Sequence, residues 1–144
     1  MEKILISACL VGENTKYNGG NNLTPYLEQL LEKYELVPFC PEVEGGLKTP
    51  RKPNERLDSK VIDSDGRDNT VAFNKGAELA YNICLYLGIE IAILKEGSPS
   101  CGVHEIYDGK FRNKKIKGMG VTAQYLKLKG IKVYNENEIE ELLK

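Results

Sequence analysis

The stretch Ile89–Leu94, IEIAIL, decides the fold together with Lys3–Leu10, KILISACL. Both runs are short and almost continuously apolar, which is typical of strands that are buried on both faces of a parallel sheet. Directly before IEIAIL lies an amphipathic segment that begins at Asp68 or Asn69 and ends near Gly88. A polar capping residue at the start and a glycine after the end predict one long helix there.

The same alternation of strands and helices continues through the rest of the chain. The further expected segments are a helix over 25–33, a strand over 34–40, a helix over 118–130, a strand over 131–134 and a terminal helix that starts at Asn135. This order favours a mostly parallel sheet with helices on both faces. With right-handed crossovers it becomes a small doubly wound, Rossmann-like α/β fold. We expect residues 1–144 to form one domain, because about 150 residues per domain is usual.

Three segments are less regular. Residues 11–22 are polar and rich in Gly and Asn, and residues 41–68 form a long polar connection in which Lys60–Ile62 reads as a short strand. Connections of this length are uncommon in compact domains and often carry function. Residues Glu105–Phe111 predict a small hairpin, with Asp108-Gly109 in a type I′ turn.

Composition excludes several classes of protein. The chain has 144 residues, with 20 Lys and Arg against 21 Asp and Glu, so its net charge is −1. Proteins that bind duplex nucleic acid usually have an excess of basic residues, and this chain has none. No apolar run approaches the roughly 20 residues of a membrane span, and the start of the chain does not resemble a signal peptide. We therefore expect a cytoplasmic protein that does not bind membranes; the sequence does not indicate an oligomeric state.

The four cysteines fall at informative places. Cys9 and Cys40 end two predicted strands, and Cys101 comes a few residues after a third. Ligands of open parallel sheets bind at the carboxyl ends of strands, so these three thiols can converge. Cys84 lies on the apolar face of the long helix and is expected to be a small core residue. The pattern alone leaves four interpretations of the trio: core filling, a redox pair, a zinc site, or an iron–sulfur cluster in which one iron has no cysteine ligand.

The residues around these thiols form several distinctive motifs. They are Cys9-Leu-Val-Gly, Phe39-Cys-Pro-Glu-Val-Glu-Gly-Gly-Leu47, Pro50-Arg-Lys-Pro53, Asp68-Asn-Thr70 with Phe73 and Gly76-Ala77, Ser98-Pro-Ser-Cys-Gly102 and Ile106-Tyr-Asp-Gly109. Together they resemble the DUF523 family over essentially the whole chain. The resemblance implies a [4Fe–4S] cluster held by Cys9, Cys40 and Cys101, with one open iron. It also implies removal of sulfur from a small thiolated nucleobase such as a thiolated pyrimidine.

The resemblance further implies an essential glutamate and an essential serine. The glutamate maps to Glu42 and the serine to Ser98, with Ser100 of the same run as the alternative. Replacing C=S by C=O requires attack by water and delivery of a proton, which a carboxylate and a hydroxyl can perform. From the sequence we also expect Tyr17, Gly19 and Ser100 to contact the substrate.

Two functions of other classes remain open from the residues. One is a module that binds thio-compounds or carries sulfur without catalysis, and the other is a zinc or redox-thiol protein. Product formation from 2-thiouracil under anaerobic conditions separates the first from a desulfidase. Iron and acid-labile sulfide content separates the second.

Overall fold

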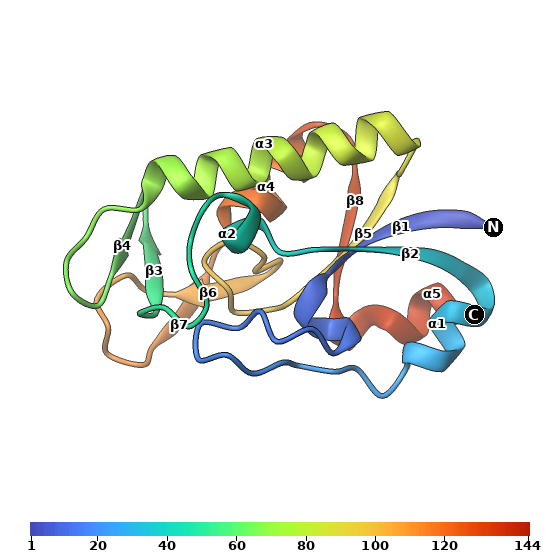
Figure 1. Cartoon of the computed structure of the whole chain (residues 1–144), viewed down its shortest axis with the longest axis horizontal. Helices are drawn as coiled ribbons and strands as arrows, with labels where there is room; N and C mark the ends of the chain where they lie inside the picture. The colour runs from blue at the N-terminus through green and yellow to red at the C-terminus, as the bar shows by residue number, and fades with distance from the viewer.

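A computed structural model describes the whole chain, residues 1–144. Its centre is a four-stranded parallel sheet in the order β2-β1-β5-β8 (Figure 1). The strands are β1 (Glu2–Ser7), β2 (Tyr34–Phe39), β5 (Ile91–Leu94) and β8 (Lys132–Asn135). The chain runs from β1 outward to β2 and then crosses to β5 on the other side, so the winding direction reverses between β1 and β5. Ligands of such sheets bind outside the carboxyl ends of the strands at this reversal.

Helices cover both faces of the sheet, as the sequence predicts. The long α3 (Thr70–Leu87) and α4 (Val121–Leu128) lie over one face, whereas α1 (Leu27–Lys33) and α5 (Ile139–Leu143) lie over the other (Figure 1). Successive side chains of a strand point to opposite faces. Accordingly, Leu5 packs in the core beneath α3 and α4, while its neighbours Ile4 and Ile6 pack in the core beneath α1 and α5. Two buried faces explain why these strands are almost continuously apolar.

The termini of α3 confirm the helix signals of the sequence. Asn69 is its N-cap residue, and Gly88 closes it in the left-handed conformation with φ 70°. The Asp68 carboxylate accepts a hydrogen bond of 2.9 Å from the Thr70 N–H. Near the other end of the chain, Asn135 and Glu138 form the expected capping box, around the short 3-10 turn η2 (Glu136–Glu138) that leads into α5.

A one-turn helix, α2 (Pro41–Glu44), follows β2 and rests directly on α3. Contact is so close that a Cβ atom placed on Gly76 would lie 2.0 Å from the carbonyl oxygen of Pro41. Only a glycine permits this approach. The position of α2, and of Cys40 and Glu42 with it, therefore depends on a residue of α3.

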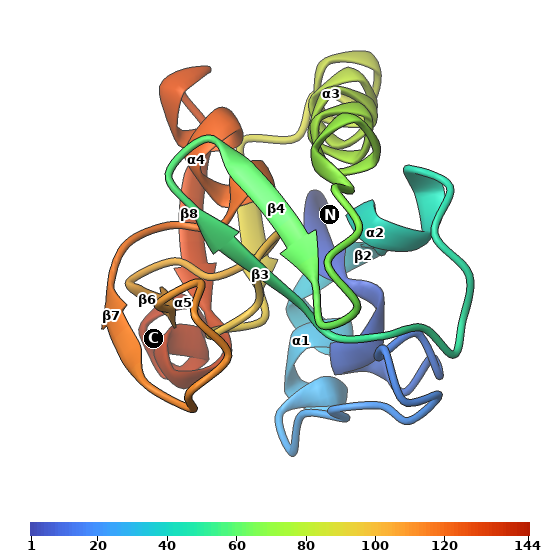
Figure 2. The same cartoon turned by 90° about the vertical axis from the view of Figure 1, so that its left-hand side faces the viewer.

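Two antiparallel hairpins stand beyond the carboxyl end of the sheet (Figures 1 and 2). The first pairs β3 (Asn54–Leu57) with β4 (Lys60–Asp63); the short strand at 60–62 is confirmed, but its partner was not predicted. The second pairs β6 (Glu105–Tyr107) with β7 (Lys115–Lys117).

The turn predicted for this second hairpin is wrong. Gly109 has a positive φ but Asp108 does not, so there is no type I′ turn, and the connection spans residues 108–114. The reason is local: the Asp108 carboxylate accepts the N–H of Lys110 at 2.9 Å and pairs with Arg112. These interactions draw the chain into a wider loop.

Strand β1 is also shorter than the predicted 3–10 run, because the chain enters the 3-10 turn η1 (Ala8–Val11) after Ser7. Among the helices, none has the length and apolarity required to cross a membrane.

Candidate active site

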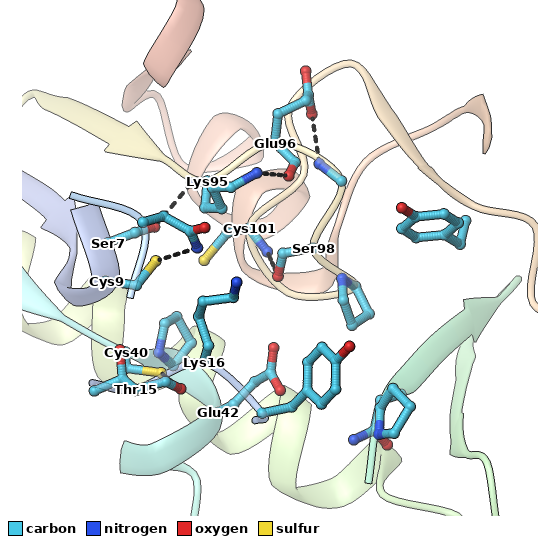
Figure 3. A pocket seen from close by; sticks show the side chains of 18 of the residues that line it. Ser7, Cys9, Thr15, Lys16, Cys40, Glu42, Lys95, Glu96, Ser98 and Cys101 are labelled. Carbon is cyan, nitrogen blue, oxygen red and sulfur yellow. Dashed lines mark hydrogen bonds between the residues drawn. The ribbon is translucent and has the colours of Figure 1, made fainter. Parts of the chain in front are cut away.

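A cavity of about 490 Å³ opens between the carboxyl ends of the strands and the two hairpins. Its walls contain Cys9, Cys40 and Cys101 together with Glu42 and Ser98. Figure 3 shows that the side chains of all five point toward this space. The structure therefore brings together the three thiols and the two acid–base candidates that the sequence singles out.

Each thiol comes from a different strand end. Cys9 lies in η1 after β1, Cys40 directly follows β2 at the start of α2, and Cys101 lies in the loop after β5. The fourth cysteine, Cys84, is 1% exposed in the core beneath α3 and α4 and does not line the cavity. Burial raises the pKa of the Cys84 thiol to about 11, so this thiol remains protonated and unreactive near neutral pH.

The three cavity thiols have individual polar neighbours. Burial raises the pKa of each thiol. A negative charge on Cys40 raises the pKa of Cys9 further, and charges on Cys40 and Cys9 raise that of Cys101. Against this, the Asn22 side chain donates to the sulfur of Cys9 at 3.4 Å, and the Ser7 hydroxyl lowers the pKa of Cys101. This environment favours neutral thiols, and thiolates here would need a cationic partner to stabilise their charge.

Two further observations concern the surroundings of these thiols. No three His, Cys, Asp or Glu side chains approach closely enough to hold a single metal ion. In addition, the Thr15 hydroxyl is a buried side-chain oxygen without a hydrogen-bond partner, and it lies in the cavity wall near Cys40 (Figure 3).

Glu42 occupies the buried floor of the site in an ion pair. Its Oε1 accepts a hydrogen bond of 3.1 Å from Arg51 Nε, and only 13% of the Glu42 side chain is exposed. Desolvation raises the pKa of Glu42, and the charge and hydrogen bond of Arg51 oppose this rise without cancelling it. A carboxyl group with a raised pKa is suited to exchanging protons near neutral pH.

The Ser98 hydroxyl is oriented toward this carboxyl group. Its oxygen accepts the backbone N–H of Ser100 at 3.1 Å and that of Cys101 at 3.0 Å. With its oxygen so engaged, the hydroxyl has its hydrogen left to donate. The nearby Ser98 hydroxyl lowers the pKa of Glu42, which agrees with a proton directed at the carboxylate.

Glu96 is a site residue that the sequence analysis missed. Its carboxylate accepts hydrogen bonds from the backbone N–H groups of Val103, His104 and Glu105 and from the Asn135 side chain, at 2.7 to 3.3 Å. One carboxylate thus closes the loop that carries Ser98 and Cys101. A glutamate after a strand has no local signature of this role, because its partners lie up to 39 residues away.

Of the three residues that were predicted to contact substrate, only one lines the cavity. Tyr17 lines the cavity and is 45% exposed. Gly19 lies farther along the same loop and does not line the cavity. Ser100 is fully buried outside it, where its hydroxyl is 2.8 Å from that of Thr122. Of the two serines, Ser98 alone therefore reaches the cavity.

Comparisons with known proteins identify the family of this chain. The family model of 2-thiouracil desulfurase matches residues 4–138. The uncharacterized protein YbbK of Bacillus subtilis is 37% identical over 150 residues, covering 97% of this chain and 99% of that protein. The solved structure of the [4Fe-4S]-dependent thiouracil desulfidase TudS, of DUF523, is 44% identical, with a TM-score of 0.94 over 99% of this chain and 95% of its own. The chain belongs to the 2-thiouracil desulfurase family.

Proposed function

We propose that this protein is a [4Fe–4S]-dependent desulfidase that converts the C=S group of a thiolated pyrimidine to C=O and releases sulfide. The observation that carries the proposal is the meeting of three thiols from three strand ends with the Glu42–Ser98 pair in one cavity. The dependence of TudS on such a cluster, at 44% identity, supports it.

Cys9, Cys40 and Cys101 would hold the cluster. Their soft sulfur donors match the preference of iron–sulfur clusters for thiolates. The unpartnered Thr15 hydroxyl is a ready hydrogen-bond donor for a sulfur of such a group. When bound, a cluster with only three cysteine ligands supplies one iron that is open to the sulfur of a substrate.

The chain's own residues would manage water and protons. In the overall reaction, water adds its oxygen to the C=S carbon, the carbon–sulfur bond breaks, and sulfur leaves as H₂S or HS⁻. Glu42 as the carboxylate takes a proton from the attacking water, and as the acid it returns a proton to the departing sulfur or the ring. Ser98 passes the proton between the carboxyl group and the reacting atoms. No electrons are gained or lost.

Arg51 has a positioning role in this scheme. Besides Glu42, its guanidinium bonds the carbonyl oxygen of Thr15 at 2.9 Å and the hydroxyl of Thr49 at 3.0 Å. It therefore fixes the carboxyl group relative to the loop that carries Thr15 and Tyr17. A fixed carboxylate keeps the proton-transfer distance constant.

Anaerobic turnover of 2-thiouracil tests the proposal. We expect the reconstituted protein to form uracil and sulfide in equal amounts, and the Cys101→Ala variant to form neither. Cys84→Ala is the matched control, because it removes a thiol outside the cavity and should retain turnover. Binding of 2-thiouracil without uracil formation by the iron-loaded protein would instead indicate a binding or sulfur-carrier module.

A further inference from the structure

The loop of residues 108–114 contains unusual backbone conformations at the cavity. Only three residues other than glycine have positive φ in the whole chain: Asp58 at 53°, Phe111 at 53° and Asn113 at 57°. Phe111 and Asn113 both line the cavity, whereas Asp58 does not. Asn and Asp tolerate this left-handed region, but a bulky aromatic residue is rarely found there. Such conformations persist where their surroundings enforce them, and they concentrate at functional sites.

The first hairpin enforces this conformation. Oε1 of Glu55, on β3, accepts the backbone N–H of Gly109 at 3.0 Å and that of Phe111 at 3.1 Å. Asp108 holds the opposite side of the loop through the Lys110 N–H at 2.9 Å. The Phe111 backbone is thus held by a hydrogen bond from a separate element of the fold, in a conformation that its own side chain disfavours.

The enforced conformation leaves an apolar ring at the rim of the cavity. Phe111 is 40% exposed, and Tyr17, from the loop after β1, is 45% exposed on the same cavity. Core packing does not explain a strained and half-exposed phenylalanine. Aromatic faces of this kind stack on nucleobases, and such stacking tolerates any base because every base has a π-face.

We propose that Phe111 is a substrate-binding residue whose ring stacks on the pyrimidine, and that Glu55 holds the loop in the strained conformation that presents it. This inference rests on the proposed function for the identity of the ligand. It assigns ring recognition to residues 108–114 and leaves the reaction at C=S to Glu42 and Ser98.

The variant Phe111→Asn separates binding from stability. Asparagine removes the ring and accepts the left-handed backbone, so the variant should melt at a higher temperature than the parent while KM for 2-thiouracil rises about 5- to 150-fold, with kcat changed much less. Asp58→Asn is the matched control, since Asp58 has the same φ outside the cavity; it should leave KM unchanged. A variant Phe111→Asn with unchanged KM, or with kcat lost and KM unchanged, would overturn the inference.

A second experiment is independent of turnover. The chain has no Trp, so Phe111→Trp introduces a single fluorescent reporter at the proposed stacking position. Titration of the full-length, cluster-loaded variant with uracil should quench this fluorescence saturably. Tyr86→Trp, 89% exposed on α3, should not respond. If the fluorescence of Phe111→Trp does not change with uracil while the protein still produces uracil, the stacking role is refuted and the proposed reaction is not. Saturable quenching in a protein without turnover refutes the proposed reaction but retains the binding site.

Discussion

Replacing Glu42 by glutamine removes the proton-transfer group while keeping most of its contacts. Glutamine offers an oxygen where Oε1 now accepts the Arg51 Nε–H at 3.1 Å, and Arg51 retains its bonds to Lys48, Thr49 and Thr15. The change replaces one charge-assisted hydrogen bond by a neutral one, which is roughly half as strong. Burial of the charge outweighs the Arg51 pair in setting the pKa of Glu42, so loss of that charge offsets the weaker hydrogen bond. We therefore expect the free energy of unfolding to change by no more than about 1 kcal/mol in either direction.

The effect on catalysis should be far larger. General acid–base groups typically contribute about 10²- to 10⁴-fold, so kcat for 2-thiouracil should fall by that factor, or by about 3–5 kcal/mol of transition-state stabilisation. The assay is anaerobic turnover followed by uracil formation, with iron content measured on the same sample. Glu44→Gln is the matched control, because Glu44 is exposed on the same short helix.

Iron content distinguishes a catalytic role from a structural one. We expect Glu42→Gln to bind iron like the parent, since the thiols are untouched. Normal turnover in this variant would refute the acid–base role of Glu42. Loss of iron together with turnover would instead show that Glu42 supports the cysteine site.

Three other perturbations have defined outcomes. Cys84→Ala should lower the free energy of unfolding by about 1–2 kcal/mol in a denaturant titration and leave iron content unchanged, because it truncates a buried core side chain; iron loss in the folded variant would place Cys84 at the site. Gly76→Ala should lower thermal stability, because the added Cβ would meet the carbonyl oxygen of Pro41 at 2.0 Å. This clash should outweigh the preference of helices for alanine over glycine, which is about 1 kcal/mol. A stabilised variant with full turnover would contradict the close packing of α2 on α3. Burial alone would raise the pKa of Glu96, but its hydrogen bonds outweigh burial and the net pKa is lowered. A lowered carboxyl pKa stabilises the fold above the unfolded value near 4.5 and loses that contribution as pH falls through the folded value. Glu96→Gln should therefore be less stable than the parent at pH 7, and the difference should shrink as the solution is acidified below the unfolded value; equal stabilities at pH 7 would exclude the anchoring role.

Much of the central fold follows from local sequence signals. The apolar run of Ile89–Leu94 and the capped amphipathic helix before it are consistent signals that agree with the observed β5 and α3. Proline lacks the N–H that a central strand donates on both sides, and Pro38 accordingly lies in β2, at the edge of the sheet. The strand-end positions of Cys9, Cys40 and Cys101 then placed three thiols at one edge, because parallel strands all end there.

The parts that sequence reasoning missed depend on contacts between distant segments. Strand β3 has only four residues and its sequence, NERL, has no apolar alternation, so its pairing with β4 is not visible locally. Asp108-Gly109 is typical of a tight turn, but side-chain interactions with Lys110 and Arg112 favour a wider loop. Glu96 and Phe111 carry no local motif. Glu96 binds the backbone N–H groups of residues 103–105, and the Phe111 N–H is held by the carboxylate of Glu55, 56 residues away.

Metal analysis of the anaerobically reconstituted protein tests most directly whether Cys9, Cys40 and Cys101 hold an iron–sulfur cluster. We predict about four irons and four acid-labile sulfides per chain in the parent and in Cys84→Ala. Folded Cys101→Ala should lose most of both. One zinc per chain in the parent, or iron and sulfide retained in full by Cys101→Ala, would contradict the three-cysteine cluster.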